Sequence, residues 1–262
     1  SLIPDGYSGD EVDLPAPVEG WVELSEMRCE GPGSVLRIGD AVVPEHGLGI
    51  ASGYDDSYNL TPARLLRNAL QLGYRGSIVH YVGMSHYARL EASSGGHYAS
   101  LTGGAINTPC AAWHRDFAER AQALGYGIIW SLSYELFDAY CWGDWKQRAS
   151  DGSPALTGWV PPSTLLSPAH AEAMGYLRAV AGAFVGIALS AGLPVRFQVG
   201  EPWWWVTGDG RPCLYDDAAR AAFGGDPPVI ADVRGVLSGA ETGLLDAAGA
   251  VLAASTAALT AA

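Results

Sequence analysis

Residues 61–83 read TPARLLRNALQLGYRGSIVHYVG and contain one complete helix-to-strand unit. Thr61 is suited to cap a helix because its hydroxyl accepts a free backbone N–H, and Pro62 loses no hydrogen bond at the first helical position. Apolar residues then recur at helical spacing up to Gly73, a residue suited to the left-handed end of a helix. The apolar run Ser77–Gly83 follows within a few residues. This stretch therefore predicts a helix followed by a buried β-strand.

The same unit recurs twice further along the chain. Thr108-Pro109 and Ser167-Pro168 are predicted to begin helices that end at Gly125 and Gly192. Short apolar runs follow these helices, and a similar run precedes the first one; they span residues 128–133, 195–200 and 48–53. The resulting order, β-α-β-α-β-α-β, and the nearly continuous apolar strands predict a parallel sheet covered on both faces.

The connections differ in length on the two sides of this sheet. Those that follow helices have a few residues, whereas those that follow strands are long: residues 84–107, residues 134–166 and the stretch after Glu201. A (β/α) barrel builds its site in this way, from loops at the carboxyl ends of its strands. We therefore predict an α/β fold, a TIM-barrel-like (β/α) domain with roughly the first four of eight βα units. An open doubly wound sheet is the alternative, although Gly53-Tyr54-Asp55-Asp56 is no phosphate-binding glycine loop.

Two regions are predicted. Residues 1–46 form a small β-rich N-terminal segment, and residues 47–262 form the barrel-like domain, which is expected to be incomplete. Short strands are predicted in the first region, and two further helices in the second; the strands span 21–24, 35–38 and 41–43, and the helices lie near 216–223 and 238–261.

Charge excludes several classes of partner. The chain has 28 Asp and Glu against 15 Lys and Arg, a net charge of −13, and such a surface repels phosphate backbones and anionic lipid. We predict neither nucleic acid nor a membrane as a partner. The first fifteen residues are acidic and proline-rich, which predicts no signal peptide. No metal or other cofactor is expected, because no H-E-x-x-H or H-x-x-x-H spacing occurs.

The sharpest local motif is Gly200-Glu201-Pro202-Trp203-Trp204-Trp205, at the end of the fourth predicted strand. A carboxylate there points into the mouth of a barrel, and tryptophans around it would raise its pKa toward the value that a general acid needs. Indole faces also stack well on sugar rings. Glu201 is therefore the candidate acid/base. The alternative is a glutamate held by Arg196 or another cation, with the tryptophans packed against a neighbouring domain.

Other polar and aromatic residues follow the predicted strands. Asp55 and Glu135 are the further catalytic candidates. The candidate substrate-binding residues are Tyr54, Asp56, His80, His86, Tyr134, Trp203, Trp204 and Trp205. Strand alternation places His80 on the opposite face from Tyr81, so a buried, hydrogen-bonded core histidine is the competing interpretation. A metal-dependent deacetylase or hydrolase is a third hypothesis, which requires His80 or His86 beside an Asp and an ion.

Two resemblances follow from these motifs. Glu201-Pro202 at the end of a fourth barrel strand resembles the acid/base site of the large clan of retaining TIM-barrel glycoside hydrolases. In that clan an Asn usually precedes the glutamate, and a second glutamate near the seventh strand is the nucleophile. Here Gly200 replaces the Asn, and no seventh strand is present in the sequence.

A closer resemblance spans roughly residues 35–225. It rests on four stretches, namely residues 37–42, 53–59, 80–87 and 200–205. They resemble TIM-barrel domains of tailed-phage and prophage tail proteins of the non-contractile tail sheath type and, more distantly, the barrel of gene-transfer-agent tail proteins. The resemblance implies a structural module of a phage virion tail, assembled in the host cytoplasm, with other tail-protein subunits as partners and host-surface glycans as ligands. An active retaining glycoside hydrolase that uses Glu201 as general acid/base is the alternative.

Overall fold

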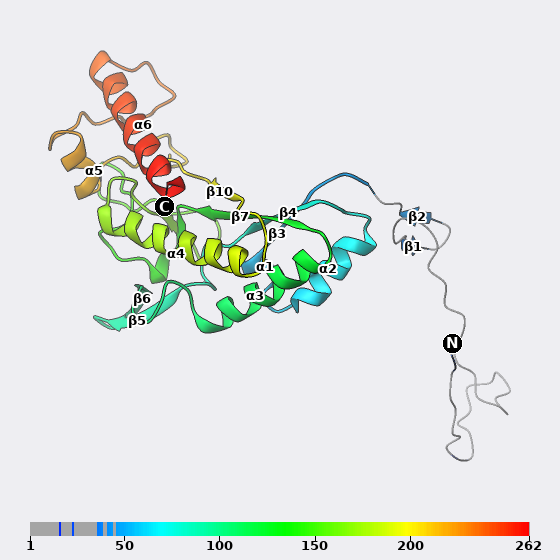
Figure 1. Ribbon diagram of the computed structural model, residues 1–262. Helices are drawn as coiled ribbons and strands as arrows, with labels where there is room; N and C mark the ends of the chain where they lie inside the picture. The colour runs from blue at the N-terminus through cyan, green and yellow to red at the C-terminus, as the bar shows by residue number, and fades with distance from the viewer. Residues whose placement is uncertain (1–15, 17–22, 24–35, 39–40, 44–45, 262) are drawn as a thin grey trace. The chain divides into compact units, whose positions relative to one another are not determined.

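The computed structural model describes residues 16, 23, 36–38, 41–43 and 46–261 (Figure 1). The chain separates into two compact units, residues 1–34 and residues 35–262. In the second unit, β1 (Leu36–Ile38) and β2 (Ala41–Val43) pair antiparallel, which confirms two of the predicted short strands. The predicted strand at 21–24, apart from residue 23, and the turn at 39–40 lie outside the described residues. The division of the chain between residues 46 and 47 stays a prediction.

Four parallel strands form the central sheet. They are β3 (Ile50–Gly53), β4 (Ser77–Tyr81), β7 (Gly127–Ser133) and β10 (Phe197–Gly200). Their spatial order is their order along the chain, with Ile50 opposite Ile78, and Trp130 between His80 and Phe197. This progression, with a helix between consecutive strands, confirms the predicted βα units and the α/β fold class.

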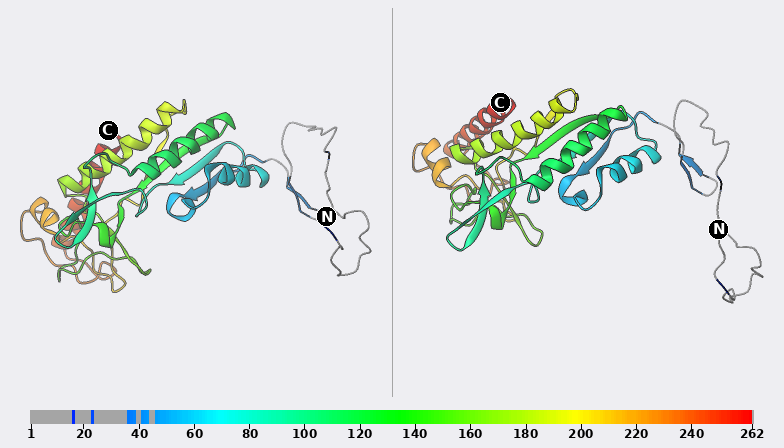
Figure 2. Two further views of the ribbon diagram at one scale, coloured as in Figure 1. Left: turned by 90° about the horizontal axis from the view of Figure 1, so that it is seen from below. Right: turned by 60° about the horizontal axis from the view of Figure 1, so that its bottom comes forward.

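Helices cover one face of this sheet. The helices α2 (Pro62–Gln71), α3 (Thr108–Ala123) and α4 (Ala171–Ser190) lie along the same side of the strands (Figures 1 and 2). The core between them is aromatic and aliphatic, and includes the fully buried side chains of Trp130, Phe117, Phe184 and Leu66. On the other face Ala51, Tyr81 and Gln198 are exposed, and no described helix covers them. The prediction of a sheet covered on both faces is therefore wrong for the described part of the chain.

The helix ends follow the predicted chemistry with two shifts. Thr61 caps α2, accepting from the Arg64 N–H at 3.3 Å. Asn107, rather than Thr108, caps α3. His170, rather than Ser167, caps α4. Both replacements carry a side-chain acceptor, the property that a cap requires. All three helices are followed by the predicted left-handed glycines, Gly73, Gly125 and Gly192, with φ of 83°, 77° and 73°.

The long connections contain structure of their own. α1 (Tyr54–Ser57) follows β3, and an antiparallel hairpin of β5 (Arg89–Ser93) and β6 (Gly96–Ser100) follows β4. After β7, the strand β8 (Glu135–Phe137) and the short helix η1 (Asp138–Tyr140) come before β9 (Ser163–Leu165), which pairs antiparallel with β8. These segments all start from the carboxyl end of the sheet, the edge that we call the rim.

Two helices complete the described chain, as predicted. α5 (Asp217–Ala222) is short, and α6 (Gly239–Thr260) starts with a capping box in which Ser238 and Glu241 exchange hydrogen bonds. α6 packs against α4 and β10. By length and composition alone α4 and α6 could each cross a membrane, and 50% of the most apolar window of α4 and 17% of that of α6 are buried in the fold. The burial of α4 is typical of a core helix.

Candidate functional site

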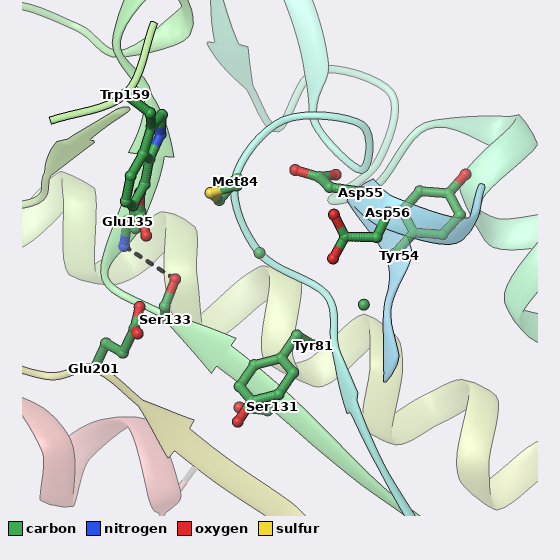
Figure 3. A pocket seen from close by; sticks show the side chains of 12 residues that line it. Tyr54, Asp55, Asp56, Tyr81, Met84, Ser131, Ser133, Glu135, Trp159 and Glu201 are labelled. Atoms are coloured by element: carbon green, nitrogen blue, oxygen red, sulfur yellow. Dashed lines mark hydrogen bonds between the residues drawn. The ribbon is translucent and has the colours of Figure 1, made fainter. Parts of the chain in front are cut away.

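A pocket of about 240 Å³ opens at the rim, where the ends of all four parallel strands meet (Figure 3). We call it the rim pocket. Its lining comes from β3 and α1, from the end of β4 and the residues after it, from β7 and β8, from the loop before β9 and from the residue after β10: Gly53, Tyr54, Asp55, Asp56, Tyr81, Gly83, Met84, Ser131, Ser133, Glu135, Trp159 and Glu201. Glu135 and Glu201 lie on one side of it, and Asp55 and Asp56 on the opposite side (Figure 3).

Two glycines allow the strand ends to come together around this pocket. A Cβ on Gly83 would lie 2.9 Å from Ser133 Oγ, and a Cβ on Gly200 would lie 2.8 Å from Ser131 Oγ. Real Cβ atoms do not approach other atoms so closely, so a larger residue at either position would push a serine out of place. The small size of Gly200 is therefore required by the position of Ser131.

Two non-glycine residues of the pocket have a left-handed backbone. Met84 has a φ of 77° and Glu201 a φ of 51°. Such conformations cost free energy for residues with a Cβ and persist only where surrounding contacts impose them. Strained backbone of this kind concentrates at functional sites.

Gln147 imposes the path of the chain that follows Glu201. Its side chain is fully buried and donates from Nε2 to the carbonyl oxygens of Leu166 and Trp203, both at 3.0 Å. Its Oε1 accepts from the Trp205 N–H at 2.8 Å. One side chain therefore ties the segment after β10 to the segment after β9, and it fixes the direction in which Glu201 enters the pocket.

Glu135 is the most perturbed acid of the pocket. Its side chain is 5% exposed, and its Oε1 is buried without a hydrogen-bond partner among the described residues. Burial raises the pKa of Glu135 to about 7; the Ser163 hydroxyl opposes this effect, and the carboxylates of Glu201 and Asp55 add to it. A carboxyl group with this pKa carries a proton near neutral pH and can donate it, as a general acid must.

Asp55 differs from Glu135 in its contacts, because both oxygens of its carboxylate accept hydrogen bonds. Oδ2 accepts from the backbone N–H and the hydroxyl of Ser85 at 2.9 and 3.1 Å. Oδ1 accepts from the His86 N–H at 3.0 Å and lies 3.1 Å from His86 Nδ1. Asp55 thus joins α1 to the segment after β4 and serves as a rigid wall of the pocket.

Two protein-family models match this chain. The model of the family described as "Non-contractile tail sheath protein TIM barrel" matches residues 44–262, and that of the "Non-contractile tail sheath N-terminal domain" matches residues 1–39. The chain belongs to the non-contractile tail sheath protein family. Membership confirms the TIM-barrel assignment and the resemblance to phage tail proteins. Membership of this family implies a component of a phage virion tail.

Solved structures similar to this tail sheath barrel include three glycoside hydrolases. An alpha-galactosidase from Lactobacillus brevis has 14% identity and a TM-score of 0.41, with 82% of this chain and 25% of that chain covered. A GH31 alpha-xylosidase from a soil metagenome has 12% identity and a TM-score of 0.34, with 66% and 25% covered. A GH31 family sulfoquinovosidase from E. rectale has 13% identity and a TM-score of 0.31, with 68% and 26% covered. The chain spans about a quarter of the length of each.

The tail sheath barrel brings five of the predicted site residues together. Tyr54, Asp55, Asp56, Glu135 and Glu201 all line the rim pocket, in agreement with the prediction that they lie at the carboxyl ends of the strands. Arg196, the cation that the alternative interpretation offered for Glu201, lies at the other end of β10 and donates to Ser77 Oγ at 3.2 Å. Glu201 is therefore not held by Arg196.

His80 does not belong to the pocket. Alternation along β4 directs Tyr81 to the pocket and His80 to the helices, where it is fully buried. Its Nδ1 lies 2.7 Å from Ser52 Oγ and its Nε2 3.2 Å from His114 Nε2. Burial lowers the pKa of His80, and neighbouring His114 lowers it further. The prediction of His80 as a substrate-binding residue is corrected to a hydrogen-bonded core histidine.

Tyr134 and the three tryptophans are also placed elsewhere. Tyr134 is fully buried, with its hydroxyl 2.8 Å from Ser255 Oγ of α6. The Nε1 of Trp204 donates to the Ala248 carbonyl of α6, Trp205 packs against the main core, and Trp203 is 45% exposed. None of them lines the rim pocket as described. The indole that lines the pocket is that of Trp159, in place of the three predicted tryptophans.

His86 lies on the rim, outside the lining of the pocket. Its ring stacks on Tyr58 with centroids 4.0 Å apart, and it contacts Asp55. Among the residues that the structure describes, no three His, Cys, Asp or Glu side chains are placed to hold a metal ion. His80 lies in the core and cannot be the ligand that the metal-dependent hydrolase hypothesis requires. His86 does lie beside Asp55, but no third such side chain joins this pair among the described residues.

Some pocket residues escaped the sequence-based prediction of the site. Ser131 and Ser133 share a face with Glu135 at a spacing of two, and that alternation alone could have identified them. Met84 has no such signal, because its position depends on the loop that follows β4.

Proposed function

We propose that the rim pocket binds carbohydrate, so that this tail sheath barrel contacts glycans of the host surface. The combination of exposed aromatic rings and carboxylates in one concave site supports this function. Tyr81 and Trp159 are 44% and 51% exposed, and they line the pocket together with Asp56, Glu135 and Glu201. Aromatic faces pack against the C–H groups of a sugar, and carboxylate oxygens accept hydrogen bonds from its hydroxyl groups.

The size of the pocket agrees with a small ligand unit. Its volume of about 240 Å³ lies below the roughly 300–1,000 Å³ of sites for drug-sized molecules. A single sugar ring in the pocket, with the rest of the glycan in solvent, suits this volume.

Binding measurements with purified protein test this proposal. Host envelope oligosaccharides are titrated into the wild-type chain and into the variants Trp159→Ala and Tyr81→Ala. Trp203→Ala is the matched control, because it removes an exposed indole outside the pocket. We expect each pocket variant to weaken binding about two- to tenfold, and the control to bind like wild type. Equal loss in Trp203→Ala, or no binding by the wild type, contradicts the proposal.

Glycoside hydrolysis is the second candidate function, and the environment of Glu135 favours it. With its raised pKa, Glu135 would keep the proton that a general acid gives to the glycosidic oxygen. Glu201, on the same side of the pocket, would supply the second carboxylate. This assignment moves the acid role from Glu201, where the sequence suggested it, to Glu135.

Release of reducing sugar from host envelope polysaccharide tests the second candidate. We expect activity in the wild type and its loss in Glu135→Gln and in Glu201→Gln. Turnover that survives in both variants contradicts these roles. Absence of turnover in the wild type removes hydrolysis and leaves binding as the function.

A further inference from the structure

The rim pocket is lined by acidic side chains and by no basic ones among its described residues. Four of its lining residues are carboxylic acids, Asp55, Asp56, Glu135 and Glu201, and none of its described lining residues is Arg, Lys or His. The nearby His86 is engaged with Asp55 on the rim. A ligand in this pocket therefore meets negative charge on two opposite sides (Figure 3).

One oxygen atom of these carboxyl groups is left without a hydrogen-bond partner, and this atom indicates a ligand. Glu135 is 95% buried and lines the pocket, yet its Oε1 has no hydrogen-bond partner in the described structure. A buried polar atom without a partner is costly, and its presence calls for a donor that the protein itself does not supply. Neither Glu135 nor Glu201 forms an ion pair with a described cation that could be this donor.

A metal ion does not suit the site as the missing partner of Glu135. Divalent cations require several oxygen ligands at short distance, and no three acidic, His or Cys side chains of the described residues are placed for that. The pocket also presents Tyr81, Met84 and Trp159, which contribute aromatic and apolar surface. An organic cation matches both properties, because it carries hydrogen-bond donors and a body that packs against rings.

We propose that the preferred ligand of the rim pocket is a cationic sugar, a protonated amino sugar whose ammonium group lies between Glu135 and Glu201 and whose ring packs against Trp159 or Tyr81. This inference rests on the carbohydrate-binding function proposed above and narrows it to one chemical class. Uronic acids, sulfated sugars and phosphorylated sugars are rejected by the acidic lining, because like charges repel at short distance.

Binding of an amino sugar changes the protonation state of Glu135. An ammonium group next to Glu135 favours the ionised form of the carboxyl group, so binding lowers the pKa of Glu135 from its value of about 7. At pH 6 the free protein holds this proton and the complex does not. Binding of the cationic sugar therefore releases close to one proton to the buffer, whereas a neutral sugar releases none.

Isothermal titration calorimetry at pH 6, in two buffers of different ionisation enthalpy, tests both consequences. The probes are the β-1,4-linked glucosamine disaccharide, its neutral N-acetylated counterpart and an anionic galacturonic acid disaccharide. We expect the amino sugar to bind at least about tenfold more tightly than the neutral one, with proton release, and the anionic one not to bind. Proton release disappears in Glu135→Gln. Glu201→Gln, a change at an exposed residue, weakens the preference for the amino sugar.

Glu119→Gln is the matched control, because it removes one negative charge from the exposed surface of α3. It should bind the amino sugar like wild type. If Glu119→Gln loses as much affinity as Glu201→Gln, the preference arises from the overall charge of the protein, and the proposal is overturned. Equal or tighter binding of the neutral disaccharide overturns it too, while carbohydrate binding stands. If no disaccharide binds, both this inference and the proposed function are wrong.

Discussion

Replacement of Glu135 by Gln should stabilise the protein at alkaline pH and leave its stability unchanged at acid pH. Burial and neighbouring carboxylates raise the pKa of Glu135 from 4.5 to about 7. A carboxyl group whose pKa is higher in the folded state contributes stability that is fully present below pH 4.5. That contribution is lost as the pH rises through 7, because the folded state must then give up a proton that it binds more tightly. Gln has no proton to lose.

The size of the effect follows from the same values. The difference between pH 4.5 and about 7, at about 1.4 kcal/mol per pH unit, corresponds to about 3 kcal/mol. The side chain is 5% exposed, so solvent screens little of it. The gain from Glu135→Gln over wild type should therefore be about 3 kcal/mol larger at pH 8 than at pH 4. A substitution that stabilises a fold in this manner marks a group retained for function.

Urea denaturation of both proteins at pH 4 and pH 8, followed by tryptophan fluorescence, measures the four free energies of unfolding. The exposed variant Glu119→Gln controls for the removal of one carboxyl group. A difference between Glu135→Gln and wild type that is the same at both pH values would refute the reasoning, since Glu135 would then have the same proton affinity in the folded and unfolded states.

Three further predictions concern the framework around the pocket. Burial lowers the pKa of His114 to about 4, so the wild type loses stability as the pH falls from 6.5 toward 4. The variant His114→Phe has no such proton to bind. Urea denaturation should therefore show that its stability falls by about 3 kcal/mol less than that of the wild type over this pH range. Gln147→Leu leaves the Trp203 carbonyl and the Trp205 N–H without a partner, and chemical denaturation should show a loss of about 1–3 kcal/mol. Ser238→Ala breaks the capping box of α6, and hydrogen exchange in the first turn of that helix should report a loss of about 1 kcal/mol. Values near zero in these experiments would contradict the corresponding contacts.

Much of the fold could be predicted from local signals. Left-handed glycines after each helix and apolar runs a few residues later identified the three βα repeats, because both features depend on neighbouring residues alone. The helix starts were less certain. Asn107 and His170 cap α3 and α4 because the loops before these helices end at those residues. The nearby Thr-Pro and Ser-Pro pairs also offer a side-chain acceptor followed by proline, so the sequence alone did not distinguish the two positions.

The site was predictable only in part, for a physical reason. Residues that directly follow a strand, such as Asp55 and Glu201, reach the rim whatever the loops do. A residue within a strand can face either side, so strand alternation left both a pocket position and a core position open for His80. Gln147 reaches the site through a long loop whose path depends on tertiary contacts, so no pattern in the sequence indicates its role.

A crystal structure of the protein with the glucosamine disaccharide tests the central claim most directly. Electron density for a sugar in the rim pocket, with its amino group between Glu135 and Glu201, is the predicted result. Density only in another site, such as the groove that Trp142 and Trp145 line beside α4, or an empty rim pocket at a saturating concentration of the sugar, would contradict it.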